Sequence, residues 1–99
     1  MRLSARQIQI IRESARELFG EDARVTLFGS RADDSARGGD VDLLVDVPGP
    51  VDQAALMMAR LSSRISRAMG GRKVDVVISA PNLNEQSIHR VARETGVRL

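Results

Sequence analysis

The stretch GSRADDSARGGDVDLLVD, residues 29–46, decides the fold of this chain. A Gly-Ser pair ends an apolar run, a polar segment follows, and Asp40 and Asp42 stand two positions apart where the next apolar run begins. Residues two apart on a strand point to the same face of the sheet, so the two carboxylates are expected to project together. A third aspartate, Asp75, lies inside the later apolar run KVDVVI, residues 73–78.

These three carboxylates converge if the strand that contains Asp75 lies beside the strand that begins at Asp40 and Asp42. Burying like charges together is costly unless a cation neutralises them. Hard oxygen ligands of this kind suit Mg²⁺ or Mn²⁺. The turn at Gly29-Ser30 offers backbone N–H groups and a hydroxyl to a phosphate. A metal site beside a phosphate site is the arrangement of a nucleotidyl-transfer centre, with Asp40, Asp42 and Asp75 as the expected metal ligands.

Purely structural interpretations stay open for some of these residues. Asp40 could simply start a strand after Gly-Gly, and Asp42 could be a solvated edge residue. Asp75 is harder to explain in that way, because Val74 and Val76 flank it in a run too apolar for a free charge. The joint pattern therefore favours a metal site.

The composition is that of an ordinary globular domain, and we expect residues 1–99 to form a single one. Fifteen Lys and Arg against thirteen Asp and Glu give a net charge of +2, with two Phe, no Trp and no Tyr. The lack of a dense basic run with interleaved aromatics disfavours a nucleic-acid reader. Cysteine is absent, which excludes disulfides and thiol chemistry. No apolar segment reaches membrane-spanning length, so we expect a cytoplasmic protein.

The hydrophobic periodicity predicts helices and strands in alternation. We expect a helix from Ser4 to about Phe19 and a helix capped by Asp52 that Gly70-Gly71 ends. A last helix is opened by Pro81 with Asn82 or Asn84 and ended by Gly96. Strands are expected at residues 24–28, 41–47 and 73–78, with a short helix at 31–36 and a short terminal strand at 97–99. This order predicts an α/β two-layer domain.

The sequence leaves one strand pairing undecided and gives two other residues purely structural roles. The first two strands could pair in parallel or antiparallel. Phe28 is expected in the core. His89 is expected on a solvated helix face together with Glu85 and Arg93, rather than as a ligand.

On Gly29-Ser30, the Asp40-Val41-Asp42 motif and Asp75, the chain resembles the minimal nucleotidyltransferases (MNT domains) of the DNA polymerase β-like nucleotidyltransferase superfamily. The resemblance covers nearly the whole chain, including the leading and closing helices. Asp33 stands where many members carry a basic residue, and Gly39 where many carry Ser. The resemblance implies a nucleotidyltransferase fold with a mixed sheet of three to four strands and helices packed on one side.

The resemblance also implies an activity and a partner. MNT domains transfer a nucleoside monophosphate from an NTP, which here suggests ATP with Mg²⁺ or Mn²⁺. Gly29, Ser30 and Arg31 are the expected phosphate-binding residues. Small MNT proteins typically act as antitoxins of a HEPN-domain toxin, and some add AMP to a tyrosine hydroxyl of that partner. We therefore expect a HEPN-domain partner and a homo- or hetero-oligomer.

Two alternatives remain. The chain could neutralise its partner by binding alone, with a catalytically weak or inactive site. It could instead modify a small molecule, a class that usually carries an additional helical domain to hold the acceptor.

Overall fold

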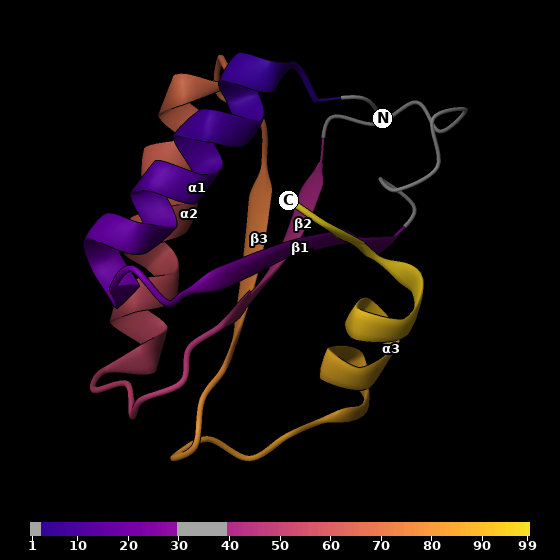
Figure 1. The fold of residues 1–99 in the computed structure, drawn as a ribbon. Coiled ribbons are helices and arrows are strands. Elements are labelled where there is room, and N and C mark those ends of the chain that lie inside the picture. The colour runs from indigo at the N-terminus through magenta and orange to yellow at the C-terminus, as the bar shows by residue number, and fades with distance from the viewer. Residues whose placement is uncertain (1–2, 30–39) are drawn as a thin grey trace.

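A computed structural model of the chain describes residues 3–29 and 40–99. Two long helices, α1 (Ala5–Phe19) and α2 (Ala54–Ala68), and a shorter one, α3 (Ser87–Thr95), accompany a four-stranded sheet (Figure 1). The strands are β1 (Arg24–Phe28), β2 (Val41–Asp46), β3 (Val74–Ser79) and β4 (Val97–Arg98). The predicted short helix at 31–36 lies outside the described residues. No helix in the described part of the chain is long and apolar enough to cross a membrane.

The sheet is mixed, with the strand order β3-β2-β1-β4. Strand β1 pairs antiparallel with β2 and with β4, while β2 and β3 pair in parallel. Helix α2 makes the crossover between the two parallel strands, as a parallel pair requires. The orientation that the sequence left open for the first two strands is therefore antiparallel. The predicted α/β class with a mixed sheet, including the short terminal strand, is confirmed.

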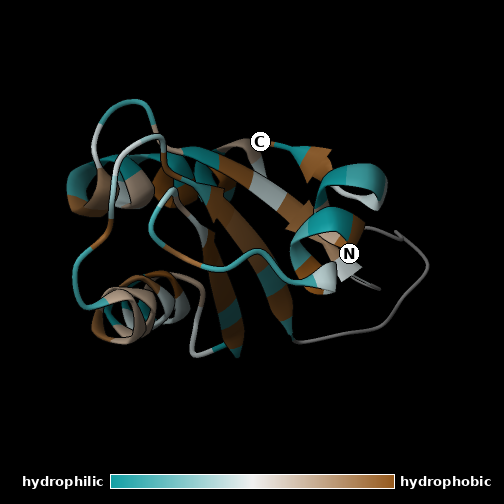
Figure 2. Ribbon diagram, turned by 90° about the horizontal axis from the view of Figure 1, so that it is seen from below, coloured by the Kyte–Doolittle hydropathy of each residue, from teal (hydrophilic) through white to brown (hydrophobic). Residues whose placement is uncertain are grey.

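The main core lies between the sheet and the α1–α2 layer. Val41, Leu43 and Val45 of β2 point into it and are fully buried, and Leu61 and Ile65 of α2 meet them there. Figure 2 shows the apolar strands between the helices on either side. Burying side chains of this size stabilises the fold by roughly 1.5–3 kcal/mol each. The alternation along β2 therefore sets which face binds the long helices.

Helix α3 packs on the opposite face of the sheet, which corrects the expectation that all helices lie on one side. Phe28, Leu44 and Ala92 form a second buried cluster there, with Val77 packed against it. The physical reason is that Leu44 follows Asp42 on the same face of β2, and an apolar side chain at this position needs a cover. Phe28 is buried, as predicted.

Two predictions about helix starts are wrong. Gln53, not Asp52, is the N-cap of α2; its backbone is left-handed (φ 53°) and its side chain makes no capping hydrogen bond. Helix α3 begins only at Ser87, because the amide of Asn82 pairs instead with both backbone groups of Val51 at 2.9 Å. The start of α1 is as predicted, since Ser4 forms a capping box with Gln7.

Candidate functional site

Two of the predicted carboxylates lie side by side in the sheet. Asp42 of β2 and Asp75 of β3 are register partners in the parallel pair. Neighbouring strands are about 4.8 Å apart, and partners in register point to the same face. Asp42 is half-buried and Asp75 is exposed. The juxtaposition that the sequence only predicted is thus built by β2–β3 pairing.

Gly29 completes this corner of the sheet from the other side of Asp42. Phe28, the last residue of β1, is the register partner of Asp42, so Gly29 follows directly beside that carboxylate. A Cβ placed on Gly29 would lie 2.6 Å from Oδ2 of Asp42, and the glycine has a φ of +77°. Both facts require glycine here, because side chains rarely adopt this φ and because the space belongs to Asp42. Glycine thus lets the chain turn while the carboxylate stays beside its backbone.

The third carboxylate, Asp40, lies one residue before β2 and is half-buried. The N–H of the next residue, Val41, donates to the carbonyl of Lys73 at 2.9 Å, which fixes the entrance to β2 beside β3. Asp40 therefore lies at the same end of the sheet as Asp42 and Asp75. Ser30 and Arg31, the other predicted phosphate-binding residues, lie outside the described residues, as do Asp33 and Gly39.

The donor set suits a magnesium or manganese ion, although it does not form a complete cage. Among residues 3–29 and 40–99, no three acidic or histidine side chains are grouped so as to hold a metal ion. Mg²⁺, however, is usually bound by one or two carboxylates together with substrate phosphates and waters, not by an all-protein site. The pair Asp42–Asp75, with Asp40 nearby, offers oxygen donors of that kind. The arrangement therefore fits a metal that arrives with a nucleotide.

Helix α3 is joined to β3 by a buried histidine, near the end of the strand opposite Asp75. His89 is only 6% exposed, which corrects the expectation of a solvated position. Its Nδ1 accepts from the N–H of Gln86 at 2.9 Å, so its Nε2 donates to the carbonyl of Ile78 at 3.0 Å. Nδ1 thus caps the start of α3 and Nε2 joins the helix to β3, so both ring nitrogens are used. His89 has no spare nitrogen for a ligand, in agreement with the sequence prediction on that point.

Arg93 makes a second connection between α3 and the sheet. Its Nη2 donates to Oδ1 of Asp46 at 2.9 Å and to the hydroxyl of Ser79 at 2.6 Å, and its Nη1 pairs with Glu85. The hydrogen bond with Arg93 lowers the pKa of Glu85, and the bonds to Glu85 and Asp46 raise the pKa of Arg93. Asp46 lies at the far end of β2 from Asp42. It anchors α3 instead of joining the acidic pair.

The sequence carried only a weak signal for these α3 contacts. His89 and Arg93 are four residues apart, so they share one helical face, and Asp46 shares its strand face with Leu44. The sequence does not show that α3 covers the sheet face of Asp46 and Leu44, so His89 and Arg93 are predicted to be solvated.

Comparisons with known proteins agree with this geometry. A family model described as a nucleotidyltransferase domain matches residues 8–97. A chain in a crystal structure of a mutant toxin–antitoxin MntA–HpeT aligns over 98% of this chain and 71% of its own length, with 18% identity and a TM-score of 0.66. A chain in a crystal structure of a toxin–antitoxin with AMP-PNP aligns over 97% and 72%, with 16% identity and a TM-score of 0.69. At such identities the likeness concerns the fold. A comparison with curated protein sequences finds no match.

Proposed function

This chain belongs to the nucleotidyltransferase domain family, and we propose that it transfers AMP from ATP to a tyrosine hydroxyl of a HEPN-domain toxin, thereby acting as an antitoxin. The observation that carries the proposal is the in-register pair of Asp42 and Asp75 beside Gly29. The structural neighbours support a toxin partner and a nucleotide, because both come from toxin–antitoxin structures and one contains AMP-PNP.

The exposure of the two aspartates suggests different roles. Asp42, half-buried beside Gly29, is the residue that would hold the triphosphate end through a cation shared with Asp40 and Asp75. Asp75 is exposed, so an acceptor hydroxyl on another protein can reach it. Bound Mg²⁺ or Mn²⁺ would offset the carboxylate and phosphate charges and polarise the phosphate oxygens.

The transfer itself is an in-line displacement. The acceptor oxygen forms a bond to the α-phosphorus, and the bond from that phosphorus to the bridging oxygen of pyrophosphate breaks. In this scheme, Asp75 receives the proton of the hydroxyl, and pyrophosphate leaves from the side of the Gly29 turn. Ser30 and Arg31 follow that turn in sequence and would bind the phosphates.

A binding-only antitoxin is the second candidate, and one observation favours it. Ile88 and Val91 lie one turn apart on α3 and are 40% and 50% exposed. Their spacing puts both on one helical face with Ala92. The structure buries only Ala92 and His89 and leaves the other two accessible to a partner.

Co-expression with a HEPN-domain toxin, followed by intact-mass spectrometry of that toxin, tests the proposal. We expect mass additions in AMP-sized steps with the native chain and none with Asp75→Asn. Asp52→Asn, the same chemical change at an exposed position outside the site, is the matched control and should leave the modification intact. A partner that stays unmodified but is still neutralised would establish the binding-only candidate. A partner that is neither modified nor neutralised would refute both.

A further inference from the structure

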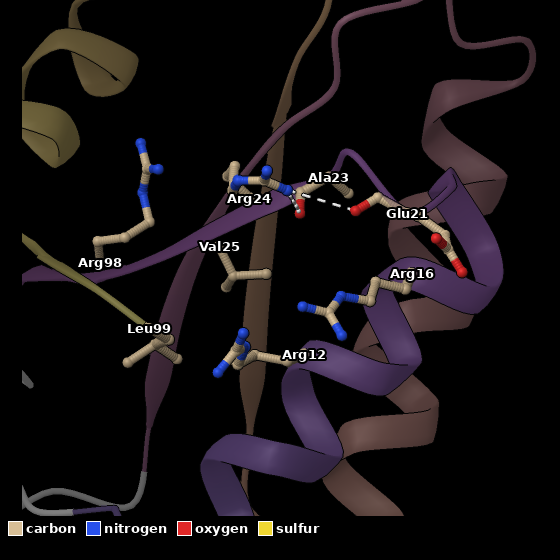
Figure 3. Close-up of a pocket in the computed structure, with 8 residues that line it drawn as sticks. All are labelled: Arg12, Arg16, Glu21, Ala23, Arg24, Val25, Arg98 and Leu99. Carbon is tan, nitrogen blue, oxygen red and sulfur yellow. Dashed lines mark hydrogen bonds between the residues drawn. The ribbon is translucent and has the colours of Figure 1, made fainter.

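A pocket of about 470 Å³ opens at the sheet edge, between α1 and the strands β1 and β4. Four arginines line it together with one glutamate and three apolar residues: Arg12, Arg16, Glu21, Ala23, Arg24, Val25, Arg98 and Leu99. Figure 3 shows Arg12 and Arg16 reaching from α1 toward β1, whereas the side chains of Arg24 and Arg98 project on the other side of β1. We infer that this arginine pocket binds the phosphate chain of a polyphosphate ligand, at a site separate from the acidic pair.

The charges of the arginine pocket are not balanced within the described chain. Four arginines and one glutamate give its lining a formal charge of +3. The ion pairs observed among the described residues use other arginines, such as Arg64 with Glu17 and Arg93 with Asp46. Guanidinium groups stay protonated at any physiological pH. The pocket is therefore a permanent concentration of positive charge.

Parts of this lining are held in place before any ligand arrives. Nη1 of Arg24 donates to the carbonyls of Glu21 and Ala23, at 3.3 and 3.2 Å, which ties its side chain across the turn before β1. Arg12 and Arg16 are four residues apart on α1, a spacing at which like charges repel and destabilise a helix. An anion between them would relieve that repulsion. Prepositioned donors with mutual repulsion favour binding of a multivalent anion.

The chemistry of the lining favours a polyphosphate over other anions. A single carboxylate would compensate only one of three formal charges, while a di- or triphosphate can compensate all of them. Base recognition normally uses stacking on aromatic rings. The chain has only two phenylalanines and no Trp or Tyr, and no aromatic residue lines the pocket. The phosphates, not a base, are therefore the recognised group.

The arginine pocket lies away from the acidic pair. Arg24 begins β1 and is the register partner of Asp46, whereas Phe28 ends β1 and is the partner of Asp42. The two sites are thus at opposite ends of the same strands. Binding at the pocket needs no carboxylate-bound cation, which separates it experimentally from the proposed transfer site and makes it independent of the proposed function.

Isothermal titration calorimetry with inorganic tripolyphosphate tests the inference. The full chain carrying Asp42→Asn and Asp75→Asn is titrated in EDTA, so that metal-dependent binding at the acidic pair does not contribute. We expect tripolyphosphate to bind about tenfold more tightly than orthophosphate, since more guanidinium groups are engaged at once. Equal or undetectable binding of the two would overturn the inference.

Charge-removal variants then locate the binding. Arg12→Gln with Arg16→Gln should weaken tripolyphosphate binding about tenfold or more, and Arg98→Gln, on a different element, should also weaken it. Arg6→Gln with Arg90→Gln removes the same charge from exposed positions outside the pocket and should change the affinity little. If both double variants lose the same affinity for tripolyphosphate, the effect comes from net charge alone, and the inference of a specific site is refuted.

Two further titrations distinguish the source of the anion. A poly-glutamate peptide that binds more tightly than tripolyphosphate would overturn the inference in favour of an acidic protein segment. A single-stranded RNA whose affinity rises with its length would overturn it in favour of a nucleic-acid backbone. Tight binding of tripolyphosphate with weak binding of both polymers supports the pocket as proposed.

Discussion

Replacing Gly29 by alanine should destabilise the protein and displace Asp42. The backbone φ of +77° costs a non-glycine residue about 1–2 kcal/mol. The added Cβ would also lie 2.6 Å from Oδ2 of Asp42, so this carboxylate must leave its rotamer at a further cost of about 0.5–1.5 kcal/mol. Together these terms lower the free energy of unfolding by about 1.5–3.5 kcal/mol, which corresponds to a fall in Tm of roughly 6–28 °C in a domain of this size.

Gly70→Ala is the matched control for the backbone contribution. Gly70 has a φ of +74°, nearly that of Gly29, but nothing lies within 4 Å of a Cβ built on it. Its replacement should therefore cost only the backbone strain. Urea unfolding of both variants measures the difference, which we assign to the clash with Asp42. A Gly29→Ala variant no less stable than Gly70→Ala would refute the reasoning.

A double-mutant cycle identifies the clash partner. Asp42→Ala keeps the Cβ of residue 42, which lies 3.6 Å from the Cβ position built on Gly29, an ordinary contact. In that background, Gly29→Ala should cost no more than Gly70→Ala, because the carboxylate oxygen is gone. An unchanged cost would mean that the destabilisation does not come from Asp42.

Three further outcomes follow from the site and its supports. Changing Asp42 and Asp75 to Asn together should abolish the rise in Tm that ATP with Mg²⁺ produces, while leaving the fold intact or more stable, because the two register partners repel each other; an unchanged rise in differential scanning fluorimetry would exclude the acidic pair as the nucleotide site. The lowered pKa of Glu85 means that its pairing with Arg93 adds stability fully above the ordinary value of 4.5 and loses it as the pH falls through the lowered pKa. The Tm difference between the wild type and Glu85→Gln should therefore shrink as the pH falls below 4.5, and a difference that grows there would contradict this pairing. Leu44→Ala, at a fully buried position under α3, should cost about 2–5 kcal/mol in urea unfolding; a loss below about 1 kcal/mol would mean that α3 does not seal this face.

Local patterns in the sequence were sufficient to place most elements. The capping box at Ser4, the apolar alternation of the strands and the terminal strand near Val97 all depend on residues close in sequence. For the same reason, strand geometry alone predicts that Asp40 and Asp42, two positions apart, project from the same face. The juxtaposition of Asp42 with Asp75 needed one added assumption, that their strands are neighbours, and the parallel β2–β3 pair confirms it.

The errors occurred where a residue depends on what packs against it from elsewhere in the chain. Both Asp52 and Asn82 are good cap residues by propensity. A left-handed Gln53 nevertheless begins α2, and Asn82 binds the backbone of Val51 instead. At Asn82 a tertiary contact overrode the local preference, and a hydrogen bond to a distant backbone group leaves no trace in the neighbouring sequence.

The amino-acid sequence by itself determined which stretches become strands and helices, and which positions carry the carboxylates. Only the tertiary structure decided that α3 covers the second face, which buries His89 and leaves Ile88 and Val91 exposed. It also gathered arginines from α1, β1 and β4 into one pocket. The physical reason is that periodicity fixes how a segment divides into faces, whereas strand pairing and packing choose which face meets the core and which distant charges become neighbours.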